Sequence, residues 1–247
     1  MKIFKTHFKI IFLALMTSWL GLGCSQLANL ENASLSTSAR KCVPPQGVSG
    51  RPNTIDDVVT LVNSLPKPVT VGCFLESLDR PLNVTLSNSQ ISVQPASGSR
   101  SPRVFILNDK LYMSVVPEGR GQDFLEISYQ TSTTTSIKAE IEFPVLEAIS
   151  KSKPYANIIS SSGTNCRSCH RAEKQVATIE DIPLIESWAF QPDKETLVDL
   201  QNFKNELSIC NFEKEPDRCE IIRAILSNGE VKTQAFPQDM YYNFSMW

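Results

Sequence analysis

Two cysteines and a histidine, spaced as Cys166-x-x-Cys169-His170, constrain the local fold more than any other feature of the sequence. One turn of helix brings residues three positions apart to the same side of the chain, so both thiols can meet one ligand. The imidazole follows directly on the same turn. An extended chain would point the two sulfurs apart. If the three side chains serve one ligand, this segment is a helical turn.

The spacing is the attachment signature of a c-type haem, which bonds to both cysteines while the histidine binds its iron. The only other histidine, His7, lies in a segment that we expect to be removed, so His170 is the one imidazole of the mature chain. A Cys-x-x-Cys pair is also found in thioredoxin-type redox disulfides and in zinc sites, where Cys210 and Cys219 would supply a second pair. The thioredoxin type needs a strand and a helix in a βαβ context, which the sequence does not show, and the zinc site would leave His170 without a role.

The amino-terminal residues 1–23 are typical of a secretory signal peptide. Three lysines precede an apolar stretch, residues 10–16, that is too short to span a bilayer. The residues leading into Cys24 resemble a bacterial lipobox, although Gly21 stands where a larger aliphatic residue is usual. The resemblance implies a lipid on Cys24 that anchors the protein at the periplasmic face of the outer membrane or at the cell surface.

The charge of the exported chain is mildly acidic. The whole sequence has 24 basic and 26 acidic residues, a formal net charge of −2. Three of the basic residues are the lysines of the signal peptide, so the mature chain has a net charge of −5. This balance does not favour binding to nucleic acid, which requires a basic surface.

The cysteine count also fits an exported haem protein. Seven cysteines are present; lipid on Cys24 and haem on the motif leave four, and an oxidising compartment keeps such thiols paired. Four cysteines permit three pairings. We predict the pairing that keeps each bridge within one part of the chain, which joins Cys42 to Cys73 and Cys210 to Cys219.

Apolar periodicity predicts an α+β chain of two parts. After a tether over residues 24–40, Thr54 and Asp57 form a capping box for a helix that ends before Pro66. Residues 69–143 alternate apolar and polar side chains between turn signals, and Ile91–Val93 is one of several short apolar runs. We predict an antiparallel β-sandwich or jelly roll over residues 41–150.

Residues 151–247 are predicted to form a second, mainly helical part. Asp193 can cap one helix, and Asp217 with Glu220 can begin another. Four arginines of the first part lie at strand ends and in loops, where we expect them to be solvent-exposed. They are Arg80, Arg100, Arg103 and Arg120.

The segment from Asn157 to Met240 resembles the c-type cytochromes, through the Cys166-x-x-Cys169-His170 motif and a methionine 70 positions after the histidine. The resemblance implies a small helical domain with one covalent haem c, ligated by His170 and Met240. Unlike the usual pattern, Pro154 and a serine-rich stretch precede the motif.

The resemblance also implies one-electron transfer to a redox partner protein that these residues do not identify. With one histidine, the mature chain offers no nucleophile–base pair, so an electron carrier is favoured over an enzyme. The alternative is a cell-surface binding module, in which the sandwich recognises a carbohydrate or a protein and a disulfide or zinc staples the C-terminal part. A haem-based sensor or peroxidase would instead need an open coordination position on the iron.

Overall fold

The computed structural model describes residues 40–237 and 242–243. The predicted signal peptide, Cys24 and Met240 lie outside the described residues. The elements in chain order are α1 (Ile55–Ser64), α2 (Val71–Ser77), β1 (Leu82–Ser87), β2 (Arg103–Asn108), β3 (Leu111–Val115), β4 (Phe124–Gln130), β5 (Thr135–Glu142), α3 (Lys153–Ala156), β6 (Ile159–Ser160), β7 (Gly163–Thr164), the 3₁₀ turn η1 (Asn165–Ser168), β8 (Lys174–Ile179), β9 (Ile182–Trp188), β10 (Phe190–Gln191), η2 (Lys194–Thr196), α4 (Leu200–Ile209), α5 (Pro216–Leu226), β11 (Val231–Thr233) and β12 (Tyr242–Asn243).

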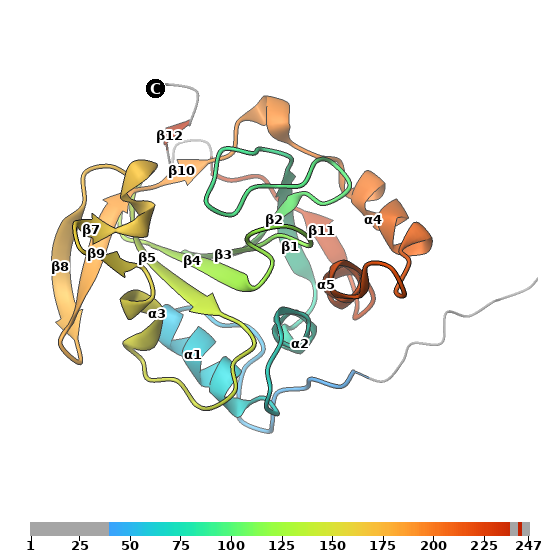
Figure 1. Cartoon of the computed structure of the whole chain (residues 1–247), viewed down its shortest axis with the longest axis horizontal. Coiled ribbons are helices and arrows are strands. Elements are labelled where there is room, and N and C mark those ends of the chain that lie inside the picture. Colours follow the sequence, from blue (N-terminus) through green and yellow to red (C-terminus); the bar gives the residue numbers. More distant parts are fainter. Residues whose placement is uncertain (1–39, 238–241, 244–247) are drawn as a thin grey trace, which may run out of the picture. The chain divides into compact units, whose positions relative to one another are not determined.

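An eight-stranded sheet organises these elements, in the order β11-β1-β2-β3-β4-β5-β9-β8 (Figure 1). Strands β1 to β5 are antiparallel neighbours in chain order. Their side chains alternate between the two faces, which is the period of two that the sequence shows. Strand β9 extends the sheet antiparallel to β5, and β11 adds a parallel edge beside β1. The predicted α+β composition is confirmed.

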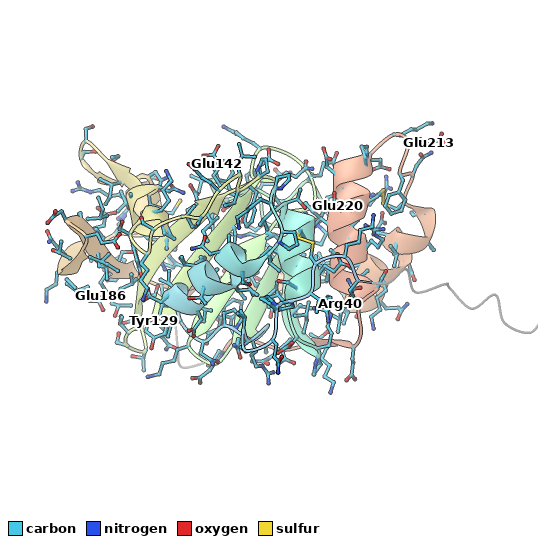
Figure 2. The ribbon with its side chains drawn as sticks, turned by 90° about the horizontal axis from the view of Figure 1, so that it is seen from below. Arg40, Tyr129, Glu142, Glu186, Glu213 and Glu220 are labelled. Atoms are coloured by element: carbon cyan, nitrogen blue, oxygen red, sulfur yellow. A yellow bond between two sulfur atoms is a disulfide. The ribbon has the colours of Figure 1, made fainter. Side chains whose placement is uncertain are left out.

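Helices α1, α2 and α5 cover one face of the sheet and form the core with it, and Figure 2 looks onto α1 and α2. The apolar residues of α1 recur every three or four positions, so Val58, Leu61 and Val62 are fully buried against the sheet. The predicted capping box is present: Asp57 N–H donates to Thr54 Oγ1 (3.1 Å), and Thr54 N–H donates to Asp57 Oδ2 (3.0 Å).

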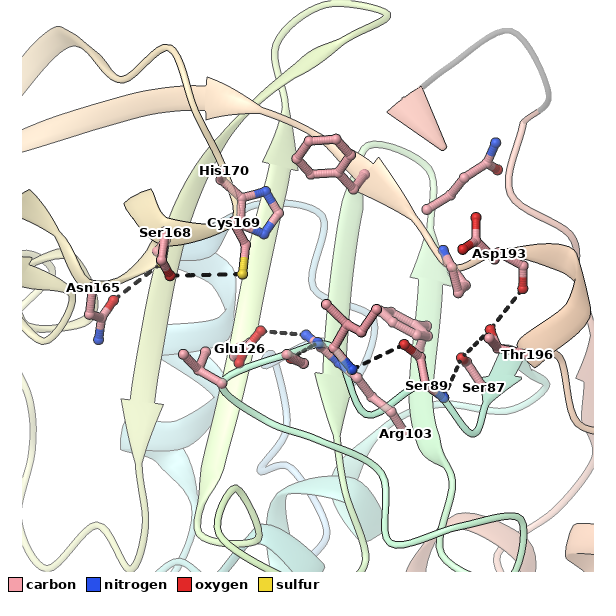
Figure 3. A pocket seen from close by; sticks show the side chains of 18 residues that line it. Ser87, Ser89, Arg103, Glu126, Asn165, Ser168, Cys169, His170, Asp193 and Thr196 are labelled. Atoms are coloured by element: carbon pink, nitrogen blue, oxygen red, sulfur yellow. Dashed lines mark hydrogen bonds and ion pairs between the residues drawn. The ribbon is translucent and has the colours of Figure 1, made fainter. Parts of the chain in front are cut away.

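The opposite face of the sheet carries the polar members of the same alternation, among them Arg103, Ser114, Glu126 and Lys138. The loop of residues 88–102 and the segment that contains the Cys166–His170 turn lie over this face (Figure 3). The sheet is therefore covered on both sides, by an apolar helical layer and by a polar layer of loops.

The strands do not form the predicted two-sheet sandwich. They make a single sheet, and the layer that buries its apolar face is helical. The apolar run Ile91–Val93 lies in the 88–102 loop instead of a strand. Ser92 separates the two apolar residues of this run, Ile91 and Val93, and both are exposed, Ile91 to 62%.

The predicted boundary at residue 150 does not divide the described residues into compact units. The described residues all belong to one compact unit, because β8, β9 and β11 of the later part join the sheet of the earlier part. Helix α5 packs on α2, where Thr70 Oγ1 donates to Glu220 Oε1 (3.1 Å). The helix expected to begin at Asp193 begins instead after Asp199, whose carboxylate caps α4. No helix of residues 40–237 is long and apolar enough to cross a membrane.

Both predicted disulfides are confirmed: Cys42 is bonded to Cys73, 31 positions away, and Cys210 to Cys219, nine positions away. On the chain-entropy model, the longer loop stabilises by about 3–4 kcal/mol and the shorter by about 2.5 kcal/mol. We therefore expect the double serine variant of Cys42 and Cys73 to lose about 1 kcal/mol more unfolding free energy than that of Cys210 and Cys219. Urea denaturation of the two variants tests the order, and the reverse order would contradict it.

Candidate functional site

The Cys166–His170 segment is a single helical turn, as its spacing predicts. Thr164 begins the turn, because its Oγ1 accepts the Cys166 N–H at 3.1 Å. The carbonyl of Cys166 then accepts both the Cys169 N–H (3.1 Å) and the His170 N–H (2.8 Å). Both thiols are free of disulfides and partly buried. The two thiols and the imidazole therefore project from one turn of the chain and lie next to one another.

His170 is held in one tautomer by the end of β9. Its Nδ1 lies 2.8 Å from the carbonyl oxygen of Trp188, and since a carbonyl only accepts, Nδ1 carries the hydrogen. Burial, with the nearby Lys138 ammonium, lowers the pKa of His170 to about 3, so the ring is neutral. Its Nε2 is then an unprotonated lone-pair donor. Metal-binding histidines commonly have this arrangement, because the carbonyl orients the ring and raises its basicity.

The β8–β9 hairpin delivers that carbonyl to the motif. The chain leaves His170, runs out through β8 and returns through β9, where Trp188 N–H donates to the carbonyl of Arg171 (3.1 Å). The next strand, β10, places Phe190 against the imidazole with ring centroids 5.3 Å apart. Nothing in the alternation of β9 identified Trp188 as a partner of His170, because the contact is a backbone one.

All three motif side chains line one cavity, drawn in Figure 3, between the polar face of the sheet and the loop of residues 88–102. Its walls include the aromatic rings of Phe105 and Phe190 and the aliphatic side chains of Ile91 and Val93. Ile91 and Val93 are 62% and 52% exposed at this rim. Two large aliphatic side chains beside the motif leave apolar surface that a bound apolar group would cover.

The floor of the cavity carries an ion pair that the sequence did not predict. Arg103 is partly buried at the start of β2, where its guanidinium pairs with Glu126 and donates through Nη2 to Ser114 Oγ (2.8 Å). The guanidinium also lies over the Phe105 ring, 4.8 Å from its centroid. We expected Arg103 to be solvated surface. The alternation of β2 and β4 could have indicated this pair, because it places Arg103 and Glu126 on the same face of the sheet.

The residues of the turn fit a covalently attached haem in type. The turn supplies two thiols without disulfide bonds and a neutral imidazole, and the cavity walls combine aromatic and aliphatic side chains with polar ones. The cavity volume of about 140 Å³ is smaller than the roughly 300–1,000 Å³ of ligand clefts.

The second predicted iron ligand, Met240, lies outside the described residues. Among the described residues that line the cavity there is neither a methionine nor a second histidine. The strand β12, two positions after Met240, is described: Tyr242 pairs with Phe190 and Asn243 with Gln191 in a parallel ladder. Phe190 and Gln191 both line the cavity. The described end of the chain is thus fixed beside the cavity wall.

The cysteines that a zinc site would have recruited are used elsewhere, since Cys210 and Cys219 are bonded to each other. Within residues 40–237, no three histidine, cysteine, aspartate or glutamate side chains form a group that could hold a metal ion.

Comparison with known proteins identifies no relative. No protein-family model matches the sequence, and neither the curated proteins nor the solved structures include a significant match to this chain.

Proposed function

We propose that this chain is an exported c-type haem protein that transfers single electrons. One observation carries the proposal: a neutral imidazole with its Nδ1 fixed by the Trp188 carbonyl stands on the same turn as two unpaired thiols, and all three line one cavity. That combination of ligand and attachment groups is the one that a haem c requires.

Each of these side chains has a separate task in the proposed function. Cys166 and Cys169 would hold the porphyrin through thioether bonds, and His170 would bind its iron through Nε2. The Trp188 carbonyl keeps the ring oriented and the ligand basic. Phe105 and Phe190 would exclude water from one side of the site. When bound, the haem supplies an iron centre that accepts and releases one electron.

Maturation in a host with haem-attachment machinery tests this proposal. The purified protein should keep haem on a denaturing gel, and its visible spectrum should change reversibly when it is reduced and reoxidised. A protein that carries no covalent haem after such maturation would overturn the electron-transfer function. A high-spin haem that binds carbon monoxide readily would favour the sensor or peroxidase alternative.

We propose Met240 as the second iron ligand. Met240→Ala is expected to remove the weak near-infrared sulfur-to-iron band of the oxidised protein and to lower its reduction potential, because a thioether ligand favours ferrous iron. Met246→Ala is the matched control and should keep both properties. Loss of the band in the control, with the band retained in Met240→Ala, would assign the ligand to Met246.

We propose further that lipid on Cys24 anchors the protein to a membrane facing the periplasm. The lipobox-like residues before Cys24 and the odd number of cysteines support this. Cys24→Ala should move the protein from the membrane fraction to the soluble periplasmic fraction. A wild-type protein that is already soluble, with an unmodified Cys24 thiol, would contradict the prediction.

A further inference from the structure

A second chamber adjoins the cavity of the motif. It lies over β2 to β5, and five residues line both spaces: Arg103, Phe105, Glu126, His170 and Phe190. Seven side chains line only the chamber: Ser114, Ser128 and Lys138 are polar, and Tyr112, Met113, Ile127 and Phe236 are aromatic or apolar. Its volume is about 70 Å³. Since one water needs roughly 10–15 Å³ by this measure, the chamber has room for a small polyatomic group and a few waters.

Lys138 is the unusual residue of this chamber. The side chain is buried on β5, where only 8% of the residue is exposed. Its Nζ donates to the hydroxyls of Ser128 (3.2 Å) and Ser136. Among the described residues, no carboxylate oxygen lies within 4.0 Å of this nitrogen. Lysines are rarely buried without a counter-charge, because removing an ammonium from water is costly.

The charges around the chamber do not balance. Arg103 pairs with Glu126, and the ammonium of Lys138 is left over. Burial lowers the pKa of Lys138 to about 8, so most of it is protonated at pH 7. Burial raises the pKa of Cys166 to about 12, so this thiol supplies no negative charge. Glu140 faces Glu126 across β4 and β5, but it does not line the chamber. Burial and the nearby Glu126 raise the pKa of Glu140 to about 7, so this carboxyl supplies only part of a negative charge at pH 7, and an anion in the chamber would balance the rest.

We propose that the chamber binds an anionic oxygen group, a carboxylate or a small oxyanion, between the Lys138 ammonium and the Arg103 guanidinium. Ser114 and Ser128 line the same space. Their hydroxyls donate to Gln94 Oε1 (3.3 Å) and Ser136 Oγ (2.8 Å), and either can turn to donate to an oxygen of the anion instead. Two sources share this chemistry: a propionate of the haem, in which case the inference rests on the proposed function, or a free oxyanion, in which case it does not.

Sulfate is a suitable probe, because it presents anionic oxygens and is not a ligand of haem iron. Its binding should be measured by isothermal titration to the full chain in two forms, matured with haem and produced without haem-attachment machinery. Lys138→Met is expected to weaken sulfate binding at least tenfold. Lys151→Met is the matched control: it makes the same substitution at an exposed lysine that pairs with Asp56, and it should leave the affinity unchanged.

The two forms of the chain distinguish the two sources. Binding to the haem-free chain alone indicates that a haem propionate fills the chamber after maturation, and binding to both forms indicates a site for a free oxyanion. Failure of both forms to bind sulfate, or equal affinities of the wild type and Lys138→Met, overturns the inference. If Lys138→Met does not fold, Lys138→Gln removes the charge and keeps a polar group. A chain that never acquires haem would overturn the proposed function, and the haem-free arm would still decide this inference.

Discussion

Replacing Cys166 and Cys169 together with serine should abolish covalent haem attachment and leave the chain folded. Both thiols are free of disulfides and stand at the surface of a cavity, so the core does not depend on them. A serine hydroxyl keeps the size of the side chain but does not form the thioether bond. The loss should be complete in a haem stain of a denaturing gel and in the mass of the intact protein.

Ser168→Ala is the control for that experiment, because Ser168 lies on the same turn and lines the same cavity. It should retain full haem attachment. Circular dichroism should show that both variants keep the secondary structure of the wild type. Haem that survives denaturation in the double serine variant would mean that another group holds the porphyrin.

The features that could be predicted from the sequence are those that neighbouring residues determine. The helical turn of the motif, the capping box of α1 and five of the strands follow from spacing and alternation alone. Both disulfides were predicted correctly from an argument about separate domains, although the chain forms one compact unit. Their pairing is local, so it did not depend on that argument.

The features that were missed depend on contacts between distant parts of the chain. Strand β9 is half-buried, and its second residue is a proline, so its apolar–polar alternation was weak. It forms a strand because it pairs with the edge of β5. The polar residues of β5 indicate a face open to water. Lys138 is nevertheless buried, because it faces a chamber whose walls include His170, Phe190 and Phe236 from later parts of the chain. The sequence of one strand does not show which distant segments of the chain will cover it.

Arg218 is expected to be the most important charged side chain for stability. Only 3% of the side chain is exposed, and it joins α5 to α4 through Glu206 Oε2 (2.7 Å). The same guanidinium donates to Ser101 Oγ (2.8 Å) and to the carbonyl of Arg100 (2.8 Å), in the loop that leads into β2. The C-terminal helices thus hold the loop that forms the rim of the cavity.

Arg218→Met should lower the free energy of unfolding by about 3–5 kcal/mol, because removing one partner of a buried ion pair is strongly destabilising and leaves Glu206 with only the exposed Arg100 as a partner. The Arg100 carbonyl also loses a donor. Arg100→Met is a matched control, since Arg100 pairs with the same Glu206 oxygen through a side chain that is 62% exposed. An exposed pair contributes about 1 kcal/mol or less.

Urea denaturation of the two variants measures the difference. The double variant Arg218→Met with Glu206→Met should recover much of the loss, because a buried ion pair replaced by apolar side chains of similar volume is often neutral. Equal destabilisation by Arg218→Met and Arg100→Met would contradict the prediction. Arg218 also fixes the loop before β2. The Arg218→Met protein should therefore bind haem less completely than the Arg100→Met protein, even where both are folded. Such a difference would link the C-terminal helices to the cavity.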